Sequence, residues 1–463
     1  MYHISTNIPH YLRARKVELN LFEIDEIGNH VLSERILTNV TRVFNKDYLN
    51  GTVATDMARI PKPDPDKRYM LYIHIPFCRQ LCTYCSFNRF YFNEERAREY
   101  FTYLRREMQM VADMGFRFEA TYIGGGTPTV LLDELAETID LAKSLFPDIK
   151  DVSSETNPTD LGTELYEALS GRVDRLSVGV QSFDNDLLHQ MGRYDTTGSA
   201  EETLAAVQSM QGKFDSFNVD MIFNFPSQTF ENLQRDIELV KQTGCNQTTF
   251  YPLMASPLRR SQLKSTIGEI DYGREYEMYK MVCNGLADTF VPSSAWTFSA
   301  DKNMIIDEYI VDYPEYVGIG SGAMSYLKGC NYTNTFSLRE YYDRLDHDKM
   351  GVTKKSEGEL SKISSMRYTF ASQLFGLRLD KSAFRKEYGV SVSAGLPAEM
   401  SFMRMVGAFA TDNREELTLT EKGRYLMVAL MRETLAGSND YRDKAREQLP
   451  LDEFRALLMK DYQ

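Results

Sequence analysis

An alternation of strand-like and helix-like segments between residues 69 and 287 limits the fold more than any other feature of the sequence. Segments rich in aromatic and β-branched residues are typical of strands, and each is followed by a segment with helical spacing of apolar residues. Strands are expected at 69–75, 120–123, 152–156, 175–180, 218–223 and 248–252, and helices at 93–114, 132–146, 164–170, 201–210, 231–243 and 274–287. This order predicts an α/β fold of βαβ units around a parallel sheet, either doubly wound or most of a barrel.

The segments on either side lack this alternation. Residues 1–67 form an N-terminal extension that ends in a stiff proline-rich linker, with prolines at positions 61, 63 and 65. Residues 336–463 are expected to be mainly helical, with a short strand at 417–423 that leads into a helix. A helix-turn-helix is possible there, but an acidic chain favours a packing or lid domain. We therefore predict three parts, residues 1–67, 68–335 and 336–463.

The charge and hydropathy of the chain exclude several classes of protein. Its formal net charge is −13, and the sequence contains no long run of basic residues, so nucleic acid is not an expected partner. No apolar stretch is long enough to span a membrane. The first residues lack the basic and apolar regions of a secretory signal. A cytoplasmic protein is therefore expected.

Three of the six cysteines lie within eight residues, directly after the first predicted strand. Binding and catalytic residues of α/β folds lie in the loops that follow strands. The three thiols, Cys78, Cys82 and Cys85, could surround one inorganic centre and leave one ligand position open, which is typical of catalytic sites. A zinc site with a distant fourth ligand such as His74, and chance, are the alternatives. The other three cysteines are expected to be buried small hydrophobic residues.

The cysteine spacing CxxxCxxC resembles the radical S-adenosylmethionine (SAM) superfamily. Further motifs follow in the order of the branch that contains oxygen-independent coproporphyrinogen III oxidase and its heme-chaperone relatives, the HemN/HemW/HutW-like family. They are residues 124–128 (GGGTP), 155–158 (ETNP), 179–183 (GVQSF), 191–193 (MGR), Asp220 and 318–323 (GIGSGA). The resemblance covers about residues 69–335 and implies a partial (β/α)6 barrel.

The resemblance also implies cofactors and the residues that hold them. Cys78, Cys82 and Cys85 would bind a [4Fe-4S] cluster whose open iron binds SAM, and reductive cleavage of SAM would give a 5′-deoxyadenosyl radical. One or two SAM molecules are possible. The residues implied in SAM binding are Tyr72, Tyr84, Gly124, Gly125, Gly126, Thr127, Glu155, Gln181, Arg193 and Asp220.

The residue types at these positions suit that chemistry, although each has a simpler alternative. The glycine run allows close approach of a ligand to the backbone, but a tight turn would explain it equally. Glu155 at a strand end suits ribose hydroxyls or an amine, and a solvent-facing Glu is the alternative. Arg193 suits a carboxylate, and Asp220 lies in an apolar strand where an unpaired acid is costly. His74 is either a structural histidine or a substrate contact.

One departure from the oxidase bears on the activity. The oxidase has a further cysteine two residues after the third ligand, where this chain has Phe87. The favoured interpretation is a radical SAM enzyme acting on a tetrapyrrole or similar conjugated substrate, possibly a C-methyltransferase using a second SAM, with an electron donor such as flavodoxin or ferredoxin. A heme-binding chaperone without turnover and the oxidase itself are the alternatives. Aromatic residues that could stack on a macrocycle, or belong to the core, are Phe90, Tyr91, Trp296, Phe298 and Tyr316.

Overall fold

The computed structural model describes residues 52–301, 304–305 and 310–456. The first 51 residues of the predicted N-terminal extension lie outside the described residues. Six parallel strands form the centre of the fold in sequential order, each hydrogen-bonded to the next. They are β2 (Tyr69–Ile75), β5 (Phe118–Gly125), β6 (Asp151–Thr156), β7 (Arg175–Gln181), β8 (Ser216–Phe223) and β9 (Gln247–Pro252). All six predicted strands are confirmed.

The predicted helices are confirmed as well, with ends within a few residues of the expected positions. They are α2 (Glu94–Asp113), α3 (Leu132–Leu145), α4 (Thr163–Leu169), α7 (Ala200–Gln208), α8 (Phe230–Gln242) and α10 (Glu275–Leu286). Shorter helices that the sequence did not predict are α5 (Asn185–Gln190), α6 (Tyr194–Thr197) and α9 (Pro257–Thr266). Because the strands follow one another in a single direction with helical crossovers, the arrangement is the partial (β/α)6 barrel and not a doubly wound sheet.

The sheet extends beyond the six predicted strands at both edges. Next to β2 it continues through β12 (Tyr316–Ile319), which is parallel to β2, and then through β13 (Met324–Leu327), β14 (Cys330–Asn334), β15 (Val352–Ser356) and β1 (Thr52–Ala54). Next to β9 it ends with β11 (Thr297–Ser299) and β10 (Val291–Pro292). Strands on both sides of the predicted boundaries at residues 67 and 335 thus belong to one sheet. The division of the chain into three parts at those positions stays a prediction.

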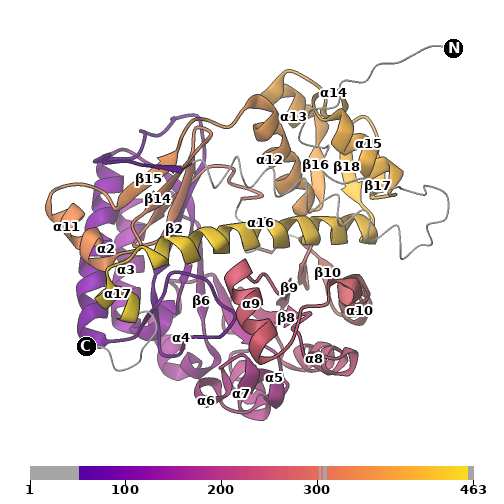
Figure 1. The fold of residues 1–463 in the computed structure, drawn as a ribbon, viewed down its shortest axis with the longest axis horizontal. Helices are drawn as coiled ribbons and strands as arrows, with labels where there is room; N and C mark the ends of the chain where they lie inside the picture. Colours follow the sequence, from indigo (N-terminus) through magenta and orange to yellow (C-terminus); the bar gives the residue numbers. More distant parts are fainter. Residues whose placement is uncertain (1–51, 302–303, 306–309, 457–463) are drawn as a thin grey trace.

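The C-terminal part is mainly helical, as expected. Its helices are α11 (Leu338–Asp346), α12 (Lys362–Phe375), α13 (Lys381–Tyr388), α14 (Val392–Gly395), α15 (Pro397–Met405), α16 (Glu421–Glu447) and α17 (Leu451–Ala456), and a small sheet contains β16 (Arg378–Asp380), β17 (Phe409–Asp412) and β18 (Glu416–Leu419). The predicted strand at 417–423 is β18, which is shorter because α16 already begins at residue 421. Figure 1 shows α16 crossing the molecule between the α12–α15 group and the α8–α10 group.

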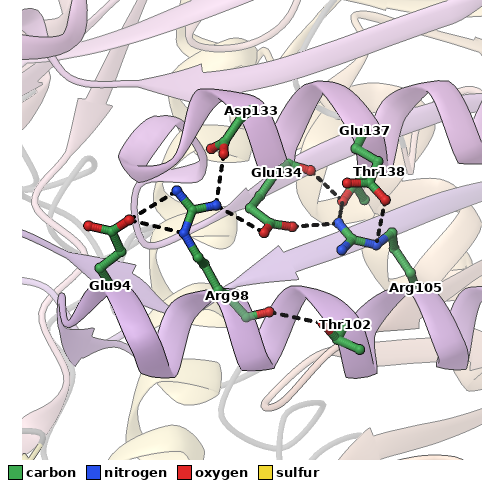
Figure 2. A network of polar contacts seen from close by, with 8 residues as sticks. All are labelled: Glu94, Arg98, Thr102, Arg105, Asp133, Glu134, Glu137 and Thr138. Atoms are coloured by element: carbon green, nitrogen blue, oxygen red, sulfur yellow. Dashed lines mark hydrogen bonds and ion pairs between the residues drawn. The ribbon is translucent and has the colours of Figure 1, made fainter.

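Local chemistry explains where the helices begin and how they pack. The Asn93 side chain accepts a hydrogen bond from the backbone N–H of Arg96 and caps α2. Helix α2 packs beside α3, and Figure 2 shows the ion pairs between them. Arg98 bridges Glu94, Asp133 and Glu134, whereas Arg105 pairs with Glu134. Such a network orders the two helices on the outside of the sheet.

The core lies between the parallel sheet and its helices. Six of the seven residues of β2 are buried, which is typical of a strand covered on both faces. Buried Glu107 on α2 accepts hydrogen bonds from the backbone N–H groups of Gly320 and Gly351 and from the Tyr341 hydroxyl. These bonds fasten the β12–β15 edge to the barrel. Within the part of the chain that the structure describes, no helix is both long and apolar enough to cross a membrane.

Candidate functional site

The cysteine segment is a loop closed by a short pair of strands at the carboxyl end of β2. The strand β3 (Phe77–Cys78) pairs with β4 (Phe90–Tyr91), and the Phe90 N–H donates to the Pro76 carbonyl at 2.6 Å. Cys82 and Cys85 lie in the loop between them. All three thiols of the motif line one cavity of about 790 Å³ at the carboxyl ends of the parallel strands. The topology therefore places all three cysteines on the wall of one cavity, where chemistry was expected.

Two buried arginines lie beside these cysteines. Arg89 donates hydrogen bonds to the carbonyls of Cys82 (2.7 Å) and Cys85 (2.8 Å), and Arg193 donates to the Cys82 sulfur at 3.3 Å. Burial raises the pKa of the Cys78 thiol to about 12. Burial also acts to raise the pKa of Cys82, but the charges of Arg193 and Arg89 outweigh it and lower that pKa. Buried positive charge is the environment that a set of thiolate ligands requires.

The geometry also bears on which inorganic group would fit. Among the described residues, no three His, Cys, Asp or Glu side chains converge closely enough to hold a single metal ion. A [4Fe-4S] cluster presents a separate iron to each thiolate, so its ligands surround a larger core. The donor set of three thiols around one cavity, with two cations beside it, fits such a cluster.

His74 is engaged on both ring nitrogens and is not placed as a fourth metal ligand. The Tyr72 hydroxyl bonds its Nδ1 at 2.9 Å, and the Asn88 carbonyl bonds its Nε2 at 2.9 Å. Burial lowers the pKa of His74 to about 4, so the ring is neutral near pH 7. These contacts support the structural interpretation of His74. His189, by contrast, lies exposed on α5.

The glycine run at the end of β5 packs against the start of the cysteine loop and is hydrogen-bonded to it. Gly125 has a φ of +112°, and a Cβ there would collide with the His74 ring. A Cβ on Gly126 would lie 2.5 Å from the Phe77 carbonyl oxygen. The N–H groups of Gly126 and Thr127 donate to the carbonyls of Ile75 (2.8 Å) and Phe77 (2.7 Å). Packing alone therefore requires glycine at 125 and 126, and their role in SAM binding stays a prediction.

Glu155 is the penultimate residue of β6 and lines the same cavity. Its carboxylate accepts hydrogen bonds from the Tyr122 hydroxyl at 2.7 Å and from the Gly125 N–H at 3.1 Å. These bonds hold the carboxylate in one orientation and leave further lone pairs on its oxygens. Glu155 is thus half-buried in the cavity wall, not directed into bulk solvent.

A chain of side chains connects two of the cysteines across the cavity floor. Arg193 bonds the Cys82 sulfur and also donates to the Asn157 side-chain oxygen at 3.0 Å. The Asn157 amide donates to the Thr127 hydroxyl at 2.7 Å, and that hydroxyl donates to the Cys78 sulfur at 3.5 Å. Sequence reasoning named Asn157 only as part of a motif and missed this role. Because Asn157 directly follows a strand, its position could have identified it as a candidate site residue.

The remaining predicted residues lie around the same cavity, except Gly124, which packs behind Glu155. Gln181 has a φ of +77°, an uncommon conformation for a non-glycine residue that often marks functional sites. Asp220 accepts hydrogen bonds from Ser177 and Asn218, both at 2.7 Å, so the acid in this apolar strand is paired. Tyr72 and Tyr84 also line the cavity.

Of the aromatic residues that could stack on a macrocycle or belong to the core, only some reach the cavity. Trp296 and Tyr316 line it. Phe90 and Phe298 belong to the hydrophobic core, in agreement with the core alternative, and Tyr91 is not a lining residue.

Helix α16 forms a wall of the cavity that the sequence analysis did not identify. Asn439 donates to the Met254 carbonyl at 2.7 Å, and Arg446 donates to the Phe87 carbonyl at 2.5 Å. Buried Asp443 pairs with Arg446 and accepts a hydrogen bond from the Ser256 hydroxyl. Helical spacing places residues 439, 443 and 446 on one face, which binds the loops after Cys85 and after β9. This helical spacing of polar residues was the feature of the sequence from which the contact between α16 and these loops could have been predicted.

Comparisons with known proteins agree with this geometry. The family model of the radical SAM superfamily matches residues 72–240. The heme chaperone HemW of Bacillus subtilis (strain 168) is 26% identical over 373 residues, which cover 77% of this chain and 96% of that protein. The anaerobilin synthase of Escherichia coli O157:H7 is 26% identical over 296 residues, covering 61% of this chain and 66% of that protein.

A solved structure shows the same fold. The structure of coproporphyrinogen III oxidase (HemN) from Escherichia coli, described as a radical SAM enzyme, is similar with a TM-score of 0.66 and 20% identity. The similarity covers 79% of this chain and 90% of that chain. The superfamily implies SAM and a [4Fe-4S] cluster as cofactors. Residues 72–240 therefore match the radical SAM superfamily, and most of the chain is similar to HemN- and HemW-like proteins.

Proposed function

We propose that the protein is a heme-binding carrier of the HemW type, which holds a tetrapyrrole in the cavity beside its radical SAM site. The observation that carries the proposal is the continuity of this cavity. It extends from the three cysteine thiols to a wall of apolar side chains on the C-terminal helices. The alignment with the Bacillus subtilis heme chaperone, over nearly the whole length of that relative, favours the carrier over the enzyme that the sequence analysis preferred.

The size and lining of the cavity support a flat apolar ligand. A volume of about 790 Å³ lies in the range of small-molecule sites. Aromatic side chains of Tyr251, Trp296 and Phe370 line it together with Met403 and Met431. Aromatic rings stack on planar ligands, and methionine adapts its shape to them.

The residues that would hold the cofactors follow from the geometry above. Cys78, Cys82 and Cys85 would bind the cluster, and Arg89 and Arg193 would offset the charge of its ligands. Glu155, Gln181, Asp220 and the backbone at 124–127 would hold SAM. In an enzyme with turnover, the cluster and SAM would supply a 5′-deoxyadenosyl radical. The proposal includes either one or two SAM molecules.

A second candidate function is radical turnover of the tetrapyrrole, including methyl transfer from a second SAM. The same cavity favours it, because a ligand against α16 would lie in one space with the thiols. The relative named anaerobilin synthase also supports it. Turnover would require an electron donor such as flavodoxin or ferredoxin in the cytoplasm. Decarboxylation as in the oxidase is disfavoured by Phe87.

Titration of the anaerobically reconstituted protein with heme tests both functions. A carrier binds about one heme per chain and forms no 5′-deoxyadenosine when SAM and a reductant are added. Release of 5′-deoxyadenosine or S-adenosylhomocysteine that depends on a tetrapyrrole would support the enzyme instead. Failure to bind any tetrapyrrole contradicts both.

A blocked cavity provides the control for specific binding. Thr434→Trp places a bulky ring on the α16 wall and is expected to abolish heme binding. Lys444→Trp adds the same ring to the exposed side of α16 and is expected to bind heme as the wild type does. Equal heme binding by both variants would place the ligand outside this cavity.

A further inference from the structure

The wall that α16 contributes to the cavity changes from apolar to polar along the helix. Its lining residues are Met427, Leu430, Met431, Thr434, Leu435, Ser438, Asn439 and Arg442. From 427 to 442 the helix rises by about 22 Å at 1.5 Å per residue. One end of the wall is thus built by methionine and leucine, and the other by hydroxyl, amide and guanidinium groups.

The apolar end belongs to the hydrophobic core of the C-terminal helices. Met427 and Met431 are part of the same cluster as Phe370 and Met403. In this part of the cavity, Arg367 forms an ion pair with Glu399 at 2.6 Å, so their opposite charges cancel. This end suits the apolar edge of an aromatic macrocycle, which carries no carboxylate, and offers it no net charge.

The polar end lies against the cysteine loop. The Arg442 guanidinium lies 4.7 Å from the centre of the Phe87 ring, two residues after Cys85, and donates to the Asn439 side-chain oxygen at 2.9 Å. Arg442 and Tyr316 line the same cavity, and the Arg442 charge opposes the rise that burial causes in the pKa of Tyr316. A cation therefore stands in the cavity wall close to the cysteine loop.

The acids that face the cavity are bonded to other groups of the wall. Glu155 accepts from Tyr122 and Gly125, Asp220 from Ser177 and Asn218, and Asp160 from Thr129 at 2.6 Å. Two of the arginines, Arg89 and Arg193, are bonded to the cysteine loop itself. Arg79 also lines the cavity, but its guanidinium donates to the Val130 carbonyl at 3.0 Å and lies over the Phe92 ring. Arg442 is the cation that α16 places in the cavity wall beside the cysteine loop.

From this arrangement we infer that Arg442 binds a carboxylate of the ligand and thereby orients it. The ligand is a flat apolar macrocycle with acidic side chains on one edge. Its acidic edge lies toward residues 85–87, and its apolar edge lies toward Met427. An arginine and a carboxylate form charge-assisted hydrogen bonds in a fixed geometry, which are stronger than bonds between neutral groups. The inference rests on the proposed tetrapyrrole site. It adds that the ligand carries carboxylates and states how the ligand is oriented in the cavity.

Heme and heme dimethyl ester, which lacks the carboxylates, provide the test. Absorbance titration of the reconstituted wild-type protein is expected to give a dissociation constant at least about tenfold lower for heme than for the diester. Arg442→Gln is expected to weaken heme binding by that factor and to leave diester binding unchanged, so that the preference disappears. Arg442→Lys keeps the charge and should keep part of the preference. Lys444→Gln, on the exposed side of α16, should behave as the wild type.

The outcomes separate this inference from the proposed function. If the wild type binds neither heme nor its diester, the tetrapyrrole site itself is wrong. If the wild type binds both equally, or Arg442→Gln keeps the wild-type preference, the site stands and the role of Arg442 is refuted. Unchanged diester binding by Arg442→Gln shows that the variant is folded. The comparison of the two ligands on the wild type needs no variant at all.

Discussion

Glu155 is the single acidic residue on which the SAM proposal depends most. Its carboxylate accepts hydrogen bonds from Tyr122 and Gly125 and lines the cavity. Glu155→Gln keeps the size and an acceptor oxygen but removes the charge. We expect SAM affinity to fall by about tenfold to a hundredfold, because hydrogen bonds to a charged group contribute about 1.5–3 kcal/mol. Calorimetric titration of the reconstituted protein measures this, with exposed Glu137→Gln as the control. Unaltered SAM affinity in Glu155→Gln would refute the assignment.

His74 makes the stability of the protein depend on pH. Burial lowers its folded-state pKa to about 4, below the ordinary value of 6.5. The unfolded chain therefore takes up a proton that the folded chain does not, and stability is present above pH 6.5 and lost as the pH falls toward 4. This residue should make the free energy of unfolding about 2 kcal/mol smaller at pH 5 than at pH 7.5.

Urea unfolding of the reduced apo-protein at the two pH values checks the contribution of His74. His74→Gln should remove that part of the pH dependence, whereas His347→Gln, on an exposed side chain, should keep it. The same pH dependence in His74→Gln and the wild type would show that the ring is not buried as a neutral group.

At the residue scale, the sequence predicted the site residues that lie within short motifs. It missed those that a segment distant in the sequence contributes to the cavity. The cysteines lie directly after a strand and Glu155 lies near the end of one, while Arg193 was predicted from a motif that resembles the family. Arg442 was not, since it lies on a helix far along the chain, and only the fold brings it to Phe87. The functions of the predicted site residues stay predictions until the cofactors are bound.

Helix α16 is the element whose position the account depends on most. Asp443 and Arg446 are almost fully buried, and this pair fastens the helix to the loop that follows Cys85. Burial lowers the pKa of Arg446 to about 10, but the group stays charged near pH 7. Asp443→Asn leaves that charge without its partner, which costs about 3–5 kcal/mol for buried pairs.

We expect Asp443→Asn to lower the melting temperature and to speed hydrogen exchange in residues 82–90 and 439–447. Lys444→Gln breaks an exposed pair with Asp440 and should change stability by less than about 1 kcal/mol. The double variant Asp443→Asn, Arg446→Met should recover part of the loss, because no unpaired charge remains. Slow exchange in residues 82–90 of Asp443→Asn would mean that α16 does not hold the cysteine loop.

At the element scale, the length of an element decided whether it could be predicted. The six central strands are buried and are separated by long amphipathic helices, so their pattern is distinct. The strands β10 to β15 and β1 have two to five residues each. A segment of that length has too few positions to show a period, and its place in the sheet is decided by neighbours distant in the sequence.

For the whole molecule, the predicted barrel is confirmed, and the favoured function is revised. The order of strands and motifs was enough to predict a partial (β/α)6 barrel with its site at the carboxyl ends. The choice between carrier and enzyme was not readable, because Cys78, Cys82 and Cys85 serve both. The C-terminal helices line the cavity in which we propose that the ligand binds, and there the sequence offered only an amphipathic pattern. The cavity unites both parts of the chain.

The central claim is that the three cysteines hold one iron–sulfur cluster that binds SAM. Electron paramagnetic resonance of the anaerobically reconstituted, reduced protein, recorded with and without SAM, tests it most directly. We expect the signal of a reduced [4Fe-4S] cluster whose shape changes when SAM is added, and loss of that signal in the variant with Cys78, Cys82 and Cys85 replaced by Ala. A wild-type protein that takes up no iron and sulfide, or a cluster signal that SAM leaves unchanged, would contradict the account.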